Sequence, residues 1–144
     1  MINRALYSSN RDDWETPQDF FDKLNEEFHF TLDPCASHST AKCAKYYTVE
    51  DNGLAKDWSG ETVFCNPPYG RDIRQWCKKC RDEARKPNTT VVMLVHARTD
   101  TRWFHDFVYG FAELRFVRGR LKFGGSKTSA PFPSMIAIFK NTEQ

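Results

Sequence analysis

Residues 90–95, TVVMLV, constrain the fold most, because five apolar residues follow one another without a polar interruption. A strand with one face in water alternates apolar and polar residues, whereas a strand buried on both faces has no need to alternate. Burial on both faces is typical of parallel sheets that helices cover on each side. This run therefore predicts a central strand of an α/β sheet.

The rest of the chain alternates helical and extended patterns. Apolar residues at helical spacing predict three helices, over 16–28, 72–85 and 99–109. Thr16 is expected to cap the first of them, with Pro17 as its first helical residue. Short apolar or alternating runs predict five further strands, over 28–32, 46–49, 61–65, 112–117 and 135–139. The order of elements predicts an open α/β sheet, mostly parallel, with an antiparallel strand at the C-terminus.

The composition fits a single domain. The chain has 144 residues, of which 40% are hydrophobic, and this suffices for one core. We expect a flexible N-terminus over 1–13 and one domain over 14–140. No run approaches the roughly 20 apolar residues of a membrane-spanning helix. The first residues also lack the apolar core of a signal peptide, so we expect a cytoplasmic protein with no membrane partner.

Five cysteines, an odd number, do not form a disulfide framework in a chain without an export signal, so we expect thiols. Cys77 and Cys80 form a CxxC pair, but they lie inside a predicted helix. Zinc would need a second ligand pair at a compatible spacing, and Cys35 and Cys43 do not provide one. We therefore expect no metal.

The sequence CNPPYG follows the predicted strand 61–65, and ligands of open α/β sheets bind at such strand ends. Two prolines make the backbone of Asn66, Pro67, Pro68 and Tyr69 rigid before any ligand arrives. The Asn66 amide oxygen and the Pro67 carbonyl are two acceptors, and Tyr69 offers a flat ring. This set fits an exocyclic amino group on an aromatic base. A plain turn is the alternative.

Such an amine is a weak nucleophile, because its lone pair is delocalised into the ring. Acceptors that hold both N–H bonds localise the lone pair and stabilise the positive charge that grows during methylation. Asn66 need not act as a base, since the proton can leave after transfer.

Asn-Pro-Pro-Tyr resembles the catalytic motif of amino-group methyltransferases that use S-adenosylmethionine. From Trp14 to Phe139 the chain resembles the compact phage-type DNA N6-adenine methyltransferases, on the stretches 14–18, 32–36, 57–58 and 98–104. The resemblance implies a Rossmann-like methyltransferase sheet and transfer of a methyl group to adenine N6 in DNA. It also implies that the target base is flipped out of the duplex.

The resemblance assigns cofactor contacts to two strand ends and one helix start. The residues implied are Thr16, Pro17, Asp33, Pro34, Cys35, Ala36, Glu50, Asp57 and Trp58. Asp57 and Trp58 are expected at the adenine of the cofactor, and Glu50 or Asp51 at its ribose hydroxyls. One departure from the family pattern is the turn 36–40, which has no glycine to let the backbone approach a ligand closely.

The net charge is only +2, but basic residues gather after position 70, which favours a polyanionic partner. The stretch 115–127 interleaves cations, aromatic rings and small residues, as in loops that contact phosphates. The candidate DNA-binding residues are Arg98, Arg118, Arg120, Lys122 and Lys127. A solvated basic strand face is the alternative for this stretch.

Several targets fit the motif. Cytosine N4 presents the same amino geometry as adenine N6, and RNA bases or a protein glutamine amide are also chemically open. A DNA-binding module that has lost its cofactor is the non-enzymatic alternative, with the glycine-free turn as its support. If the chain is phage-encoded, we expect it in the cytoplasm of a bacterial host.

Overall fold

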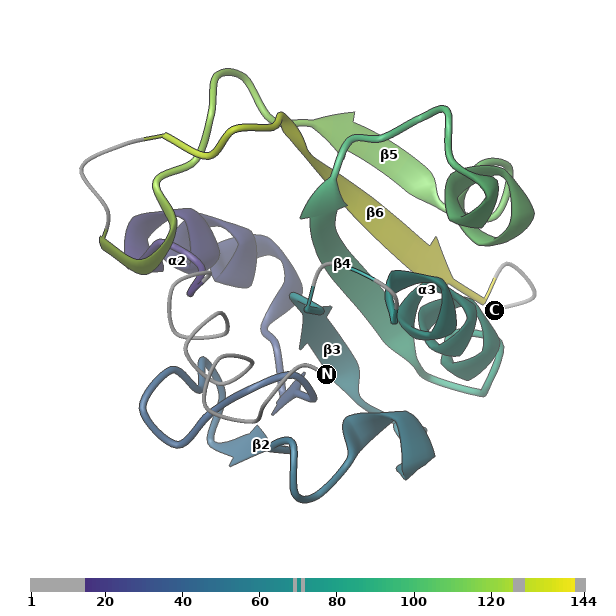
Figure 1. Cartoon of the computed structure of the whole chain (residues 1–144). Helices are drawn as coiled ribbons and strands as arrows, with labels where there is room; N and C mark the ends of the chain where they lie inside the picture. Colours follow the sequence, from purple (N-terminus) through teal and green to yellow (C-terminus); the bar gives the residue numbers. More distant parts are fainter. Residues whose placement is uncertain (1–14, 69, 71, 126–128, 142–144) are drawn as a thin grey trace.

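The computed structural model of the chain describes residues 15–68, 70, 72–125 and 129–141. The expected flexible segment 1–13, together with Tyr69 and Lys127, lies outside the described residues. Within them a single six-stranded mixed sheet forms the centre of the molecule, with helices packed against it (Figure 1). The expected α/β fold with a mostly parallel sheet is therefore confirmed.

The sheet order is β2-β1-β3-β4-β6-β5. Its strands are β1 (Leu32–Asp33), β2 (Lys45–Tyr46), β3 (Thr62–Cys65), β4 (Thr90–His96), β5 (Glu113–Phe116) and β6 (Ser134–Lys140). The neighbours β2, β1, β3 and β4 are parallel, whereas β6 runs antiparallel to both β4 and β5. The expected C-terminal antiparallel strand is thus β6, and it lies inside the sheet instead of at its edge.

Strand β4 is buried along almost its whole length, as its apolar run predicts. Val91, Met93 and Val95 point into one core cluster, and Val92 and Leu94 point into a second cluster on the other face. The first cluster is covered by α3 (Ile73–Glu83) and the π-helical turn η2 (Phe104–Val108). The second is covered by α2 (Gln18–Phe28) and by the segment between β5 and β6.

Four local predictions differ from the structure. The strand expected over 28–32 is β1, which begins only at Leu32 because α2 continues to Phe28, and the strand expected over 46–49 is β2, which ends at Tyr46. Pro17, not Thr16, is the N-cap of α2, and it makes no side-chain capping hydrogen bond. The helix expected over 99–109 is shorter in the structure, where it corresponds to η2. Trp103 and Phe107 are buried in the core, as expected. None of the described helices is long and apolar enough to cross a membrane.

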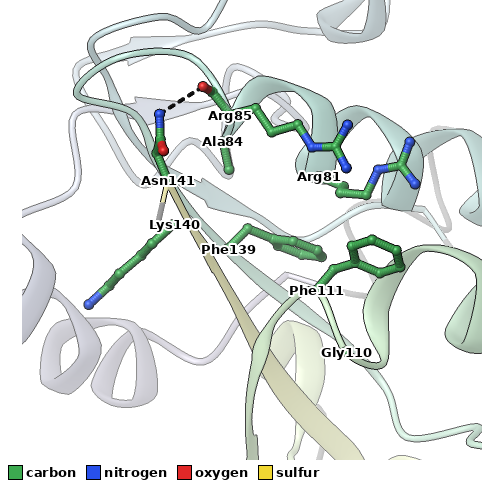
Figure 2. Close-up of a pocket in the computed structure, with 8 residues that line it drawn as sticks. All are labelled: Arg81, Ala84, Arg85, Gly110, Phe111, Phe139, Lys140 and Asn141. Atoms are coloured by element: carbon green, nitrogen blue, oxygen red, sulfur yellow. Dashed lines mark hydrogen bonds between the residues drawn. The ribbon is translucent and has the colours of Figure 1, made fainter. Parts of the chain in front are cut away.

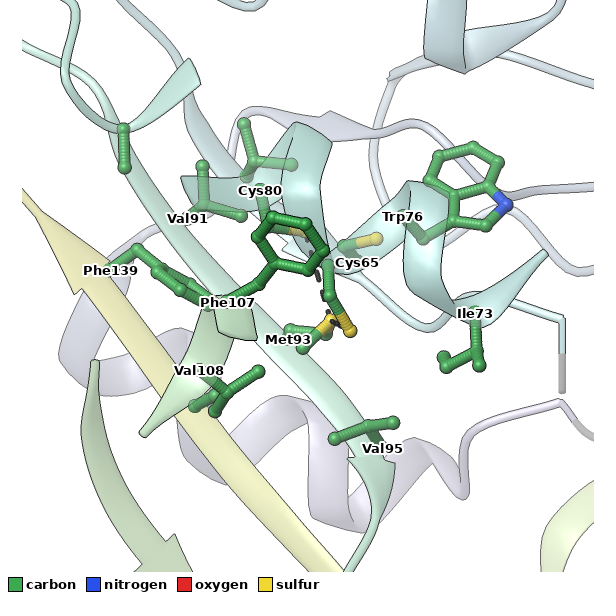
Figure 3. Packing of buried hydrophobic residues seen from close by; sticks show 14 of the residues in the cluster. Cys65, Ile73, Trp76, Cys80, Val91, Met93, Val95, Phe107, Val108 and Phe139 are labelled. Carbon is green, nitrogen blue, oxygen red and sulfur yellow. Dashed lines mark hydrogen bonds between the residues drawn. The ribbon is translucent and has the colours of Figure 1, made fainter. Parts of the chain in front are cut away.

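The cysteines, all within the part of the chain that the structure describes, are thiols, as expected. Cys77 and Cys80 are buried, with their sulfur atoms 4.0 and 3.8 Å from the Met93 sulfur. Figure 3 shows Cys80 and Met93 within the apolar cluster between α3 and the sheet. The CxxC pair therefore packs in the core.

His96 ends β4 and is buried between aromatic rings. Its ring centroid lies 5.4 Å from that of Trp103 and 5.5 Å from that of Phe132. Burial, and secondarily the charge of Arg98, lower the pKa of His96 to about 4 from its ordinary 6.5. The imidazole is therefore neutral at physiological pH and packs as an aromatic ring.

We predict that His96→Gln removes part of the acid sensitivity of folding. Below pH 6.5 the unfolded chain takes up a proton on His96, while the folded protein does not until about pH 4, so stability falls as the pH falls through this window. Between pH 7.5 and 5 this contributes a loss of at most about 2 kcal/mol. Urea unfolding at both pH values measures it. An equal loss in wild type and His96→Gln would contradict the prediction.

Candidate active site at the carboxyl ends of the strands

The site forms where β1, β3 and β4 end at one edge of the sheet. Leu32 pairs with Val63 and Cys65 with Met93, so these parallel strands run side by side toward that edge. Asp33 lies at the end of β1, and Asn66 directly follows β3. The topology thus brings together two motifs that lie more than 30 residues apart in the sequence.

Asn66 is joined to the start of α2 by a hydrogen bond. Its amide nitrogen Nδ2 donates to the Thr16 hydroxyl over 3.0 Å, and Thr16 is buried. This bond fixes the orientation of the amide, because its nitrogen faces Thr16 and its acceptor oxygen therefore lies on the other side of the amide carbon. Pro67 is buried and Pro68 is half-buried, so the prolines hold the backbone next to this amide.

The buried Asp33 organises the loop after β1. One carboxylate oxygen accepts the Cys35 backbone N–H over 3.3 Å, and the other accepts the Lys42 backbone N–H over 3.0 Å. The Ala36 N–H donates to the Tyr47 carbonyl, which ties the loop to the end of β2. Cys35 is half-buried, with its sulfur 3.6 Å from that of Cys65. This loop therefore has a defined conformation without a glycine of its own.

Gly53 packs closely against this loop. A Cβ atom on Gly53 would lie 2.3 Å from the Pro34 carbonyl oxygen, well inside van der Waals contact. Only glycine therefore fits against the turn after β1. The sequence did not indicate this contact, because Gly53 lies outside the turn 36–40, in a separate segment, the short helical turn η1 (Gly53–Ala55).

Trp58 holds Gly53 in place. Its indole nitrogen donates to the Gly53 carbonyl over 3.1 Å, and its backbone N–H donates to a Glu83 carboxylate oxygen over 2.6 Å. The Trp58 side chain is fully buried, so its ring offers no surface to a ligand in this conformation. The expected contact of this ring with a cofactor therefore finds no support in the placement of Trp58.

The Asp57 side chain is exposed to solvent, whereas that of Trp58 is buried. Its carboxylate accepts hydrogen bonds from the Ser59 hydroxyl and backbone and from Lys86, and 69% of its side chain is exposed. The bond from the Ser59 hydroxyl, followed by that from Lys86, holds the pKa of Asp57 well below its usual range. Asp57 and Trp58 thus do not form one binding face.

Glu50 and Asp51 also differ in their surroundings. The Asp51 carboxylate accepts the backbone N–H and the hydroxyl of Thr48, over 2.9 and 3.1 Å. These bonds, the backbone one first, lower the pKa of Asp51. Asp51 therefore stabilises its own turn. Glu50 is exposed, with no such contact among the described residues.

Lys42 is a site residue that sequence reasoning missed. Its side chain is 5% exposed, and its ammonium group donates to Glu15 over 3.0 Å and to Gln18 over 2.9 Å. These contacts join the start of α2 to the loop after β1, on the same side as the bond between Asn66 and Thr16. The sequence carries no signal for this role, because the partners lie more than 20 residues away.

The basic segment after β5 lies beside the start of α2. The Gly124 backbone N–H donates to the Glu15 carbonyl over 2.9 Å, one residue from Thr16. The described candidate DNA-binding residues are all exposed: Arg98, Arg118, Arg120 and Lys122. Arg120 also reaches the Ala130 carbonyl over 3.4 Å. No group of three or more metal-binding side chains occurs among the residues that the structure describes.

Comparison with known proteins defines the class. Residues 4–144 match the DNA N-6-adenine-methyltransferase (Dam) family, so the chain belongs to this family and is by class an adenine-specific DNA methyltransferase. It is 29% identical over 148 residues to the DNA N-6-adenine-methyltransferase of Haemophilus phage HP1, covering 97% of this chain and 85% of the relative. It is 32% identical over 114 residues to that of Escherichia phage T1, covering 77% of this chain and 47% of the relative. The expected family is confirmed.

We predict that Gly53→Ala disturbs the turn after β1. The added methyl group must displace the Pro34 carbonyl, at a cost of about 1–3 kcal/mol in the free energy of unfolding. We expect weaker binding of S-adenosylhomocysteine as well, measured by calorimetry. Gly60→Ala is the matched control, because Gly60 has a φ of +80° but no atom within 4 Å of the added Cβ. It should lose stability through backbone strain and keep its affinity for this ligand. Wild-type affinity in Gly53→Ala would contradict the prediction.

Proposed function

We propose that this protein transfers a methyl group from S-adenosylmethionine to the N6 amino group of adenine in DNA, with the base flipped into a pocket formed at Asn66, Pro67, Pro68 and Tyr69. The observation that carries the proposal is the partly buried hydrogen bond between Asn66 and Thr16. It orients an amide acceptor at the strand end that this chemistry requires. Family membership supports the reaction and its target.

The sheet topology supports a Rossmann-like methyltransferase fold. From β1 the chain moves to β2 on one side, and it then returns to β3 on the other side of β1. The order reverses between β1 and β3, and ligands of open α/β sheets bind at such a switch point, outside the carboxyl ends of the strands. Asp33 and Asn66 flank it.

The residues around β1 fit S-adenosylmethionine, which when bound supplies a methyl group activated by a positive sulfur. The turn over 34–36 is held by the carboxylate of Asp33, and Gly53 approaches it as closely as glycine alone permits. The exposed carboxylate of Glu50 suits ribose hydroxyls, and Asp57 suits the amino group of the cofactor adenine. We assign Thr16 and Pro17 to the wall shared with the substrate pocket.

Asn66 and Pro67 act on the target amine. The Asn66 amide oxygen and the Pro67 carbonyl each accept one N–H bond, and they stabilise the positive charge that develops on nitrogen during transfer. Because Asn66 is a neutral amide, it holds the amine without removing its proton, which leaves afterwards. Tyr69 contributes a ring for stacking on the base.

The exposed cations Arg98, Arg118, Arg120 and Lys122 are proposed to contact DNA phosphates. Three of them lie on the segment that Gly124 anchors beside Thr16. Phosphates there would lie close to the proposed base pocket. These contacts position the duplex without reading its sequence.

The alternatives are less well supported. Cytosine N4 fits the same acceptors, but the family match favours adenine. The module without a cofactor drew its support from the absent glycine in 36–40, but the loop after β1 is held by the Asp33 carboxylate and packed closely by Gly53 without one.

We predict that Asn66→Ala slows methyl transfer by about a hundredfold to a thousandfold, because a preorganised acceptor is lost from the transition state. Asn66→Asp should keep partial activity, since a carboxylate also accepts hydrogen bonds. The measurement is single-turnover transfer to DNA at saturating DNA and cofactor. Calorimetry with S-adenosylhomocysteine is the control and should show little change. A normal rate in Asn66→Ala would refute the proposed role of the motif.

A further inference from the structure

A cleft lies at the opposite end of the sheet from Asn66. It has a volume of about 410 Å³ and forms where α3 and β6 end and where the chain leaves η2. Figure 2 shows its lining, which consists of Arg81, Ala84, Arg85, Gly110, Phe111, Phe139, Lys140 and Asn141. The register of Thr90 with Lys140 places the cleft at the start of β4, whereas the candidate active site lies beyond its end.

Two arginines form one wall of the cleft: Arg81 in the last turn of α3, and Arg85 just after the helix ends at Glu83. Figure 2 shows the guanidinium groups of Arg81 and Arg85 pointing in the same direction, while the Lys140 side chain points away from them. Arg81 is fixed, because its guanidinium lies 5.0 Å from the Phe107 ring centroid and 5.2 Å from that of Phe111. It also donates two N–H bonds to Asp82, over 3.2 and 3.0 Å.

The charge of Arg85 is not balanced by a carboxylate among the described residues. Its side chain is exposed and makes no ion pair there, although its backbone carbonyl accepts the Asn141 amide over 2.9 Å. Arg81, in contrast, forms an ion pair with Asp82 over 3.0 Å, so the uncompensated charge at this wall is that of Arg85. The fixed position of Arg81 beside Arg85 is therefore favourable for an anion that both guanidinium groups can bind.

An aromatic surface lies next to this pair. Phe111 is 44% exposed, although it is a large apolar side chain, and Figure 2 shows its ring below the two guanidinium groups. A ring with an open face beside two cations suits a planar ligand that carries a negative group. The cleft volume lies within the range of small-ligand sites.

We propose that this cleft binds a nucleotide, with the phosphate on Arg81 and Arg85 and the base against Phe111. The nucleotide can be free or part of a DNA strand, since both present an anionic phosphate group and a planar base. This inference does not rest on the proposed methyl transfer, because the cleft shares no residue with Asn66 and its surroundings.

Thymidine 5′-monophosphate is the probe, because thymine lacks the exocyclic amino group that Asn66 is proposed to hold. It is titrated without methyl donor into the ¹⁵N-labelled full chain, and backbone amide signals are followed by NMR. We expect shifts at 81–85, 110–111 and 141. Arg85→Gln and Phe111→Ala should each weaken binding by about tenfold. Lys23→Gln, which removes an exposed charge on α2, is the matched control and should bind like wild type.

Two further ligands define the source and the chemistry. A DNA strand is the source if hexathymidylate binds more tightly than the mononucleotide and Arg85→Gln weakens both. A free nucleotide is the source if the two ligands bind with equal affinity. Inorganic phosphate should bind more weakly than either. The proposal is overturned if phosphate binds as tightly as the nucleotide, if the shifts cluster at 64–70 instead, or if Arg85→Gln binds like wild type. None of these results bears on methyl transfer.

Discussion

The hydrogen bond from the Asn66 amide to the Thr16 hydroxyl joins residues 50 positions apart, and the arrangement of the candidate site depends on it. Its acceptor Thr16 is buried and its donor Asn66 is half-buried, so loss of the bond would cost about 1 kcal/mol. Thr16 lies at this position because α2 packs on the sheet, with the Phe21 ring 5.1 Å from that of Phe64 in an edge-on contact. The aromatic packing of α2 thus sets the orientation of the amide that we propose to hold the target base.

A second set of contacts connects the other face of the sheet to the same site. Glu83 of α3 accepts the Trp58 backbone N–H, Trp58 donates to the Gly53 carbonyl, and Gly53 packs against Pro34. The helix that covers one face therefore supports the turn after β1, while α2 on the other face supports Asn66. Both supports consist of side chains that do not themselves have to touch a ligand. The candidate site is therefore supported from both faces of the sheet.

The sequence was sufficient to predict the elements with strong local signals. The apolar run of β4 predicted a buried central strand, which is found, and the paired prolines follow the end of β3 as expected. Contacts between segments that are far apart in the chain could not be predicted from the sequence. Threonine is a common helix cap, but the Thr16 hydroxyl accepts a hydrogen bond from Asn66 instead. The glycine that packs against Pro34 comes from η1, a separate segment. The family is established by comparison, whereas the roles of the site residues remain proposals that the geometry supports.

The central claim is that Thr16 orients Asn66 for catalysis, and replacing its hydroxyl tests this most directly. Thr16→Val keeps the shape of the side chain and removes the acceptor, whereas Thr16→Ser keeps the acceptor. The measurement is the single-turnover rate of adenine methylation at saturating DNA and S-adenosylmethionine. The account predicts a rate lowered by about tenfold or more in Thr16→Val. It also predicts a rate close to wild type in Thr16→Ser, with little change in DNA affinity in either variant. A wild-type rate in Thr16→Val would contradict the account.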